Sequence, residues 1–413
     1  MKKINLLVRK FAACTLSAAM IVSISGCSGG TGSSQTQKKE AQATVKTEKT
    51  EAPKEQNPPE AAPPGYAEQA FADVEPLPEA VELNLGSLSS STHGFTNYLI
   101  EKLGGYEKAN IDANVIVFGN GPILVEAMAS GDCDAGLYGL GGTLAGTIGQ
   151  GFVNLGAGSR DFHALQFYSP NDSDIVKAGQ VTPGVPGLYG TADTWRGKEI
   201  FLPLGTTLHF MLSRGLEKLG LTTDDVTLTH MEVPNINTAL RAGQCQVGGV
   251  WTNYPYGDLN DTCTAVMKAS DVGVTLVTCF AATPKALADG KKAEGIKKWM
   301  ELYFDAVDWM YASDENRAQA VQWFMEWNED NGIASVQEEI EAHCEYQRCY
   351  TLEENYQMFQ EKSANGQYSK LVEFNVEPLR FFVEQGNYKP EDIDTFQQPQ
   401  YFDSSFVEEL YAK

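Results

Sequence analysis

The chain has 413 residues, with 54 acidic side chains against 31 Lys and Arg, and a formal net charge of −23. No basic patch or stripe typical of nucleic-acid-binding proteins is visible, so we expect no nucleic-acid partner. The charge does not exclude an anionic ligand, because local backbone dipoles can bind an anion within an acidic protein. About 330 residues follow the N-terminal region, enough for two lobes that share a core.

The N-terminus is typical of a bacterial lipoprotein. Basic side chains precede the apolar stretch Phe11–Ser23, which is short for a membrane span of about 20 residues. Ile24–Cys27 (ISGC) resembles a lipobox; the alternative is an ordinary signal peptide with an incidental cysteine. We expect residues 1–26 to be a signal peptide and Cys27 to carry lipid on the outer face of the cytoplasmic membrane. Residues 27–80 are polar and predict a disordered tether that spans roughly 40 Å.

Strand and helix patterns then alternate along the chain. The first group predicts strands at 82–88, 114–118, 135–138 and 153–157, with helices from about 92 to 104 and 122 to 131. Residues 164–168 are expected to begin the crossing to a second group of elements. A Gly- and Pro-rich surface insertion is predicted at 181–190, and strands are predicted at 199–202, 226–229 and 247–251. Helices are expected at 208–220 and 236–243, a strand at 274–280 returns, and aromatic-rich helices follow residue 291.

The two groups of elements repeat each other. His93 precedes IEKLG by the spacing that separates His209 from LEKLG, and EAMASGDCDAG (126–136) matches TALRAGQCQVG (238–248) in pattern. We therefore expect a first lobe at 81–165 plus 284–413 and a second lobe at 166–283. The hinge would lie near 166–196 and 272–284.

Polar residues and glycines gather where strands end and helices begin, the edge of an α/β sheet at which ligands bind. Helix N-termini attract anions without Arg or Lys, although ordinary N-capping by Ser and Thr is the alternative. An aromatic side chain at a strand end can floor a pocket or belong to the core, and each matched histidine can bind a ligand oxygen or simply pack. The expected ligand-binding residues are Ser90, Ser91, Thr92, His93, Asn120, Gly121, Tyr138, Gly139, Gly205, Thr206, Thr207, His209, Trp251, Asn253 and Tyr254.

The cysteines and the missing catalytic motifs indicate neither a metal site nor a catalytic site. Cys133 and Cys245 enter strands and are expected to be buried thiols, whereas Cys263 and Cys279 could form a disulfide that the sequence does not establish. Cys344 and Cys349 are five residues apart, which places them on different faces of a helix, so no metal site is expected. Nucleophile elbows, P-loops and zinc motifs are missing, so we expect neither an enzyme nor a cofactor. Trp195 is expected to pack at the lobe boundary.

Three sequence motifs together indicate a family resemblance. WRGKEIFLPLGTTLH, EAMASGDCDAG and ALRAGQCQVGGVW resemble motifs of the substrate-binding proteins of bacterial ABC importers for sulfonates, nitrate and thiamine-precursor pyrimidines, including those that bind taurine and alkanesulfonates. The resemblance covers roughly 82–310. Gln246 departs from it, since the family carries Asp there, and this change could affect lobe packing or the cleft.

The resemblance implies an α/β, bilobal type II periplasmic-binding-protein fold: two open sheets with flanking helices and a C-terminal helical layer packed on the first lobe. It implies a monomer that closes on a small solute and docks on a membrane permease with its ATPase. A sulfonate-like organic anion is the expected solute. The alternatives are a neutral heteroaromatic, such as a pyrimidine, thiamine or flavin precursor, stacked on Trp251 or Tyr254, and a surface sensor without transport. The fold also resembles pyrimidine-precursor synthases, but their C-C-C-F-C phrase is missing here.

Overall fold

A computed structural model describes residues 65–89, 91–161, 163–251 and 257–413. The expected signal peptide, Cys27 and the expected tether up to residue 64 lie outside these residues, as do the candidate residues Ser90, Asn253 and Tyr254. Within the described ranges, no helix has the length and apolar character needed to span a bilayer.

The first of two five-stranded sheets has the order β2-β1-β3-β10-β4. β1 is parallel to β2 and β3, whereas β10 is antiparallel to β3 and β4. The bounds are β1 (Val81–Leu88), β2 (Ile111–Phe118), β3 (Ala135–Tyr138), β4 (Val153–Asp161) and β10 (Leu276–Ala282). We call this sheet and the helices packed on it the first lobe.

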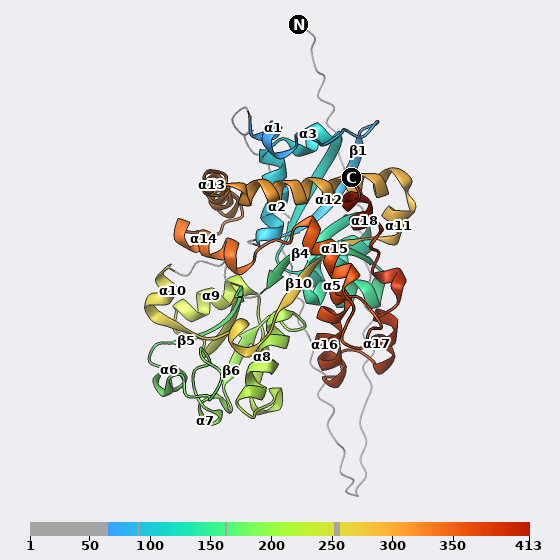
Figure 1. Cartoon of the computed structure of the whole chain (residues 1–413). Coiled ribbons are helices and arrows are strands. Elements are labelled where there is room, and N and C mark those ends of the chain that lie inside the picture. The colour runs from blue at the N-terminus through green and yellow to red at the C-terminus, as the bar shows by residue number, and fades with distance from the viewer. Residues whose placement is uncertain (1–64, 90, 162, 252–256) are drawn as a thin grey trace, which may run out of the picture. The chain divides into compact units, whose positions relative to one another are not determined.

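The second sheet repeats this arrangement in the order β7-β6-β8-β5-β9. β6 is parallel to β7 and β8, and β5 is antiparallel to β8 and β9. The bounds are β5 (Leu165–Pro170), β6 (Glu199–Leu202), β7 (Thr227–His230), β8 (Val247–Trp251) and β9 (Cys263–Lys268). The chain crosses between the sheets after β4 and after β9, so the expected bilobal α/β fold is confirmed (Figure 1). β10 belongs to the first sheet although it falls within 166–283, and β9 has no counterpart among the predicted strands.

Helices cover both faces of the first sheet. α2 (Thr92–Lys102) and α12 (Gly290–Ala312) pack on β1, and α3 (Gly105–Ala109) packs on β2 and on these two helices. α4 (Gly121–Ser130) packs on the opposite face of the sheet, where Leu124 meets Gly86. α5 (Leu140–Leu144) follows β3 and continues into a π-helical turn at Ala145–Gly149. The second lobe holds α6 (Asp174–Ala178), α7 (Ala192–Trp195), α8 (Thr207–Lys218), α9 (Val233–Arg241) and α10 (Gly257–Thr262), with 3-10 turns at Thr223–Asp225 and Ser270–Val272.

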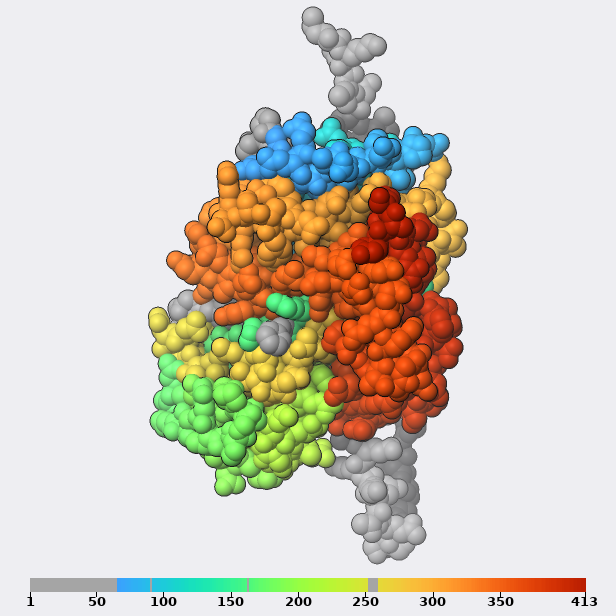
Figure 2. Space-filling model, viewed as in Figure 1, coloured from blue at the N-terminus to red at the C-terminus, as the bar shows by residue number. Residues whose placement is uncertain are grey.

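The C-terminal helices form a layer that reaches both lobes. Its members are α11 (Pro284–Ala288), α13 (Asp314–Asp330), α14 (Gln337–Tyr346), α15 (Leu352–Gln360), α16 (Lys370–Glu384), α17 (Pro390–Phe396) and α18 (Ser405–Tyr411), with a 3-10 turn at Pro399–Tyr401. α12 and α13 pack on the first lobe, as expected, but α16 also contacts α8 of the second lobe. Figure 2 shows the red residues of this layer along the right side of the molecule, beside the green second lobe, and the orange residues across the molecule above that lobe.

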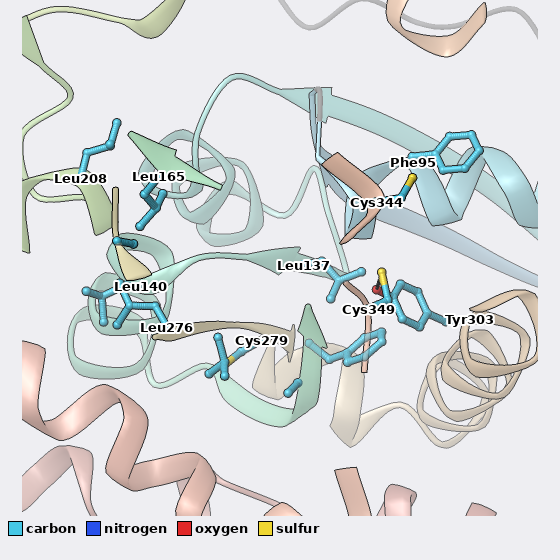
Figure 3. Packing of buried hydrophobic residues seen from close by; sticks show 14 of the residues in the cluster. Phe95, Leu137, Leu140, Leu165, Leu208, Leu276, Cys279, Tyr303, Cys344 and Cys349 are labelled. Carbon is cyan, nitrogen blue, oxygen red and sulfur yellow. Dashed lines mark hydrogen bonds between the residues drawn. The ribbon is translucent and has the colours of Figure 1, made fainter. Parts of the chain in front are cut away.

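The aromatic stripe predicted after residue 291 is core. Trp299 and Tyr303 of α12 are fully buried, and their rings lie 5.3 and 4.7 Å from that of Phe280 in β10. Tyr303 also lies beside Cys349, at 3.2 Å between Oη and Sγ (Figure 3). Large aromatic side chains at helical spacing thus fix α12 against the first sheet.

Three predictions are wrong in detail. The folded body begins before residue 81, because α1 (Tyr66–Ala70) forms and Phe71 is buried after it. The segment 181–190 is not purely a surface insertion, since Leu188 is fully buried. Trp195 lies inside the second lobe, where its Nε1 donates to Tyr189 O at 2.8 Å, because α7 turns the indole inward.

The described cysteines are all buried and free, Cys133 and Cys245 among them as expected. Cys263 lies in β9 of the second sheet and Cys279 in β10 of the first sheet, so the possible disulfide between them is not formed. Among the described residues, no group of three His, Cys, Asp or Glu side chains is placed to hold a metal ion.

Candidate functional site

A cavity lined by residues of both lobes has about 530 Å³ of empty space, part of which is open to solvent. It opens at the carboxyl ends of the parallel strands, the edge at which ligands bind in open α/β sheets. Its lining residues are Leu88, Ser89, Ser91, His93, Gly119, Asn120, Gly121, Pro122, Gly139, Leu140, Gly141, Gly142, Asp161, Thr206, Thr207, Trp251, Thr278 and Gln347.

Three long helices begin at this cavity. Ser91 caps α2 by accepting from Gly94 N, and Asn120 caps α4 by accepting from Ile123 N at 3.1 Å. Thr206 precedes α8 but its hydroxyl donates to Pro203 O at 2.7 Å, so it makes no side-chain cap. N-capping, the alternative for the Ser and Thr residues, therefore applies to Ser91 and does not apply to Thr206. The positive ends of the helix dipoles meet at the cavity all the same.

A buried polar wall forms the first-lobe side of the cavity. His93 Nδ1 lies 3.0 Å from Ser159 Oγ, and its Nε2 lies 3.3 Å from Ser91 Oγ. A register shift in β10 between Val277 and Cys279 brings Thr278 Oγ1 within 3.1 Å of the same Ser159 hydroxyl. Burial lowers the pKa of His93 to about 3, so this imidazole is neutral at physiological pH.

Asp161, at the end of β4, is the one charged side chain among the described lining residues. It is 3 % exposed, and Gln347 Nε2 donates to its Oδ1 at 2.6 Å. Gln347 is held in turn, because its Oε1 accepts from Thr92 N at 2.8 Å. Burial raises the pKa of Asp161 to about 6, and the hydrogen bond from Gln347 opposes part of that rise.

The two lobes touch across the cavity. Asn120 Nδ2 at the start of α4 donates to Glu232 Oε2 before α9, at 3.0 Å. The backbone of Gly141 approaches Gly205 so closely that a Cβ there would lie 2.6 Å from Gly205 O. Behind this contact, Trp251 Nε1 donates to Thr207 Oγ1 at 3.4 Å. The structure therefore has a closed cleft in which a solute would be enclosed.

The candidate residues divide into three groups. Those that line the cavity are Ser91, His93, Asn120, Gly121, Gly139, Thr206, Thr207 and Trp251, and as ligand contacts they remain predictions. Those behind it are Thr92, Tyr138, Gly205 and His209. His209 Nδ1 accepts from Gly205 N at 3.3 Å and its ring packs edge-on against Phe381 and Phe382, so it is a packed imidazole rather than a lining residue. The third group, Ser90, Asn253 and Tyr254, lies outside the described residues.

Sequence reasoning missed Asp161, Thr278 and Gln347. Asp161 ends a buried strand, so the rule applied to the other strand ends could have found it. Thr278 depends on the bulge in β10, and Gln347 follows α14 from a distant part of the chain. No local pattern marks either of them.

Gln246, the departure from the family pattern, lies away from the cavity. Its Oε1 accepts from Glu199 N of β6 at 3.1 Å, just as Asp134 Oδ2 accepts from Asn84 N of β1 at 3.1 Å in the first lobe. The amide thus makes the same link between strands that the carboxylate makes. Gln246 therefore takes part in the contact between strands and does not line the cleft.

Curated relatives support the resemblance read from the sequence. A putative binding protein of Brucella abortus is 24% identical over 306 residues, which cover 73% of this chain and 86% of the relative. A putative ABC transporter periplasmic binding protein of Brachyspira hyodysenteriae is 25% identical over 183 residues, or 44% of this chain and 51% of the relative. No family model matches the chain.

Solved structures share the fold. The alkanesulfonate-binding protein of Xanthomonas axonopodis pv. citri, bound to MOPS, is 16% identical with a TM-score of 0.57, over 81% of this chain and 99% of its own. The periplasmic nitrate-binding protein of Synechocystis PCC 6803 is 13% identical with a TM-score of 0.59, over 81% and 89%. The chain therefore has the bilobal α/β fold of the periplasmic binding proteins, and its predicted resemblance to the substrate-binding proteins of ABC importers is confirmed.

Proposed function

We propose that this protein is the extracytoplasmic solute-binding component of an ABC importer. The observation that carries the proposal is the cavity between the lobes, whose walls come from the strand ends of both lobes. A solute that touches both lobes favours the closed state, which would then dock as a monomer on a permease with its ATPase. The names of the relatives support the same role.

We infer that the protein is held at the outer face of the cytoplasmic membrane through lipid on Cys27. The basic, apolar and lipobox segments at the N-terminus support this location. The polar stretch before residue 65 would then place the folded body away from the membrane surface.

For the solute, we propose a small organic anion of the sulfonate type. The N-termini of α4 in the first lobe and α8 in the second lobe both line the cavity, and Thr206 and Thr207 lie at the start of α8. Backbone N–H groups and helix dipoles can neutralise such a head group without Lys or Arg, and the described lining residues include neither.

A neutral heteroaromatic is the second candidate, favoured by the apolar part of the wall. Trp251, Leu88, Leu140 and Pro122 all line the cavity and offer flat or apolar surface to a ring. In this case the ring would stack on Trp251, and the helix termini would bind its polar substituents.

Thermal melts with and without ligand test these proposals. We expect stabilisation by at least one member of a panel of sulfonates, nitrate, carboxylates and pyrimidines. No shift with any sulfonate, nitrate or carboxylate would refute the anion proposal. Trp251→Ala should abolish binding of a stacked ring but only weaken binding of an anion. Uptake of the labelled ligand by cells, lost on deletion of the gene, separates an importer from a surface sensor.

A further inference from the structure

Among the described residues, only one oxygen of the Asp161 carboxylate has a hydrogen-bond donor. Its Oδ1 accepts from Gln347 Nε2, and no other side chain or backbone group of the described residues donates to it. A Cβ built on Gly139, which also lines the cavity, would lie 3.9 Å from Asp161 Oδ2. The second oxygen therefore faces the cavity wall where the two lobes meet, since Gly139 also approaches Thr207.

The described residues that line the cavity hold this carboxylate in place but include no Lys or Arg. The neighbouring groups on the same wall are the neutral imidazole of His93 and the hydroxyl of Thr278. Gln347 is fixed by Thr92 N, so its amide is oriented as a donor to Asp161. A buried carboxylate without a full set of donors is costly in free energy, and a bound ligand can supply the missing donor.

We propose that Asp161 and Gln347 form a subsite for an amino group of the solute. The N–H donor of the ligand would meet Asp161 Oδ2, while the rest of the ligand reaches the N-termini of α4 and α8. This inference rests on the proposed solute-binding function and narrows the class of solute. It takes a ligand that carries an amino group at one end and an acceptor or anionic group at the other.

Two sources could supply this shared chemistry: the ammonium group of an aminoalkanesulfonate and the exocyclic amine of an aminopyrimidine. Matched pairs of probes separate them. Taurine and ethanesulfonate form the first pair, and 4-amino-5-hydroxymethyl-2-methylpyrimidine and its 4-deamino analogue form the second. The probes of each pair differ in the amino group.

Isothermal titration of the wild-type protein with each probe at pH 8 provides the test. We expect the amino member of one pair to bind at least 30-fold more tightly than its partner, because the partner leaves Asp161 unpaired. In Asp161→Asn this preference should fall to threefold or less, while affinity for the partner without the amino group is retained. Asp112→Asn, at an exposed carboxylate on β2, is the matched control and should retain the preference.

The outcomes separate this inference from the proposed function. Equal binding within each pair, or a preference that survives in Asp161→Asn, would overturn the amino subsite and leave the solute-binding role standing. Absence of binding by all four probes would also overturn the amino subsite, whereas the anion proposal itself is decided by the wider panel of sulfonates, nitrate and carboxylates. A folded Asp161→Asn, verified by its melting curve, ensures that a lost preference does not reflect an unfolded protein.

Discussion

Replacing Asp161 by Asn should stabilise the ligand-free protein at neutral and alkaline pH. Asparagine keeps an oxygen that can accept from Gln347 Nε2 but carries no buried charge. A pKa raised from 3.8 to about 6 corresponds to a destabilisation of about 3 kcal/mol when the carboxylate is ionised. Because the folded-state pKa lies above the unfolded value, this cost is absent below pH 3.8 and complete above pH 6.

Differential scanning calorimetry of protein freed of bound solute measures the effect. For a folded body of about 350 residues, 3 kcal/mol corresponds to a rise in Tm of about 4 °C. We expect that rise at pH 8 and a difference equivalent to less than about 1 kcal/mol at pH 4, where the folded-state carboxyl is protonated and the unfolded-state carboxyl is only about half ionised. Asp112→Asn should change Tm by less than about 1 °C at either pH. A variant that melts below wild type at pH 8, or a rise independent of pH, would refute the reasoning.

Three further outcomes follow from the structure. Gly141→Ala should weaken binding of the solute at least tenfold without lowering the Tm of the open protein, because its Cβ would meet Gly205 O only when the lobes close. Gly149→Ala is the control, since the space around its Cβ is open. Equal effects of the two substitutions on binding would contradict this prediction. The six described cysteines are free and buried, so they should react with a thiol reagent only after unfolding. Dithiothreitol should not shift Tm, because these cysteines form no disulfide. Fast labelling of the native protein would contradict the burial of these thiols. Cys27→Ser should abolish incorporation of labelled palmitate and release the protein from membranes, whereas continued incorporation would exclude Cys27 as the lipid site.

Most of the fold was predictable because both lobes use the same local signals. Strands β3, β6 and β8 coincide with their predicted ranges, and each is a short apolar run bounded by turn residues. β9 escaped prediction because its half-buried residues carry no clear alternation. The burial of Phe71 was missed for a different reason: a few aromatic residues at the end of a polar stretch find their partners only in the tertiary structure, as Tyr66 does against Trp309.

The candidate site was predictable only where it is built from the ends of consecutive elements. Ser91, Asn120 and Thr207 follow strands directly, so the rule of the sheet edge found them. Gln347 comes from the C-terminal helical layer, almost two hundred residues from its partner Asp161 in sequence, and only the folded chain brings the two together. The packed role of His209 likewise depends on Phe381 and Phe382 of α16, which no local pattern connects to it.

The pairing of Gln246 with Glu199 N bears on how second lobes are recognised in other sequences. The side chain at this position must supply an oxygen that accepts a hydrogen bond from the backbone N–H of the neighbouring strand. The neutral amide of Gln246 does this in the second lobe as the carboxylate of Asp134 does in the first. In the first lobe the acid has a further task, since Asp134 also binds Lys292 at the start of α12. A search pattern that insists on Asp at both positions would therefore discard genuine internal repeats, and one that accepts Asp, Asn, Glu or Gln would retain them.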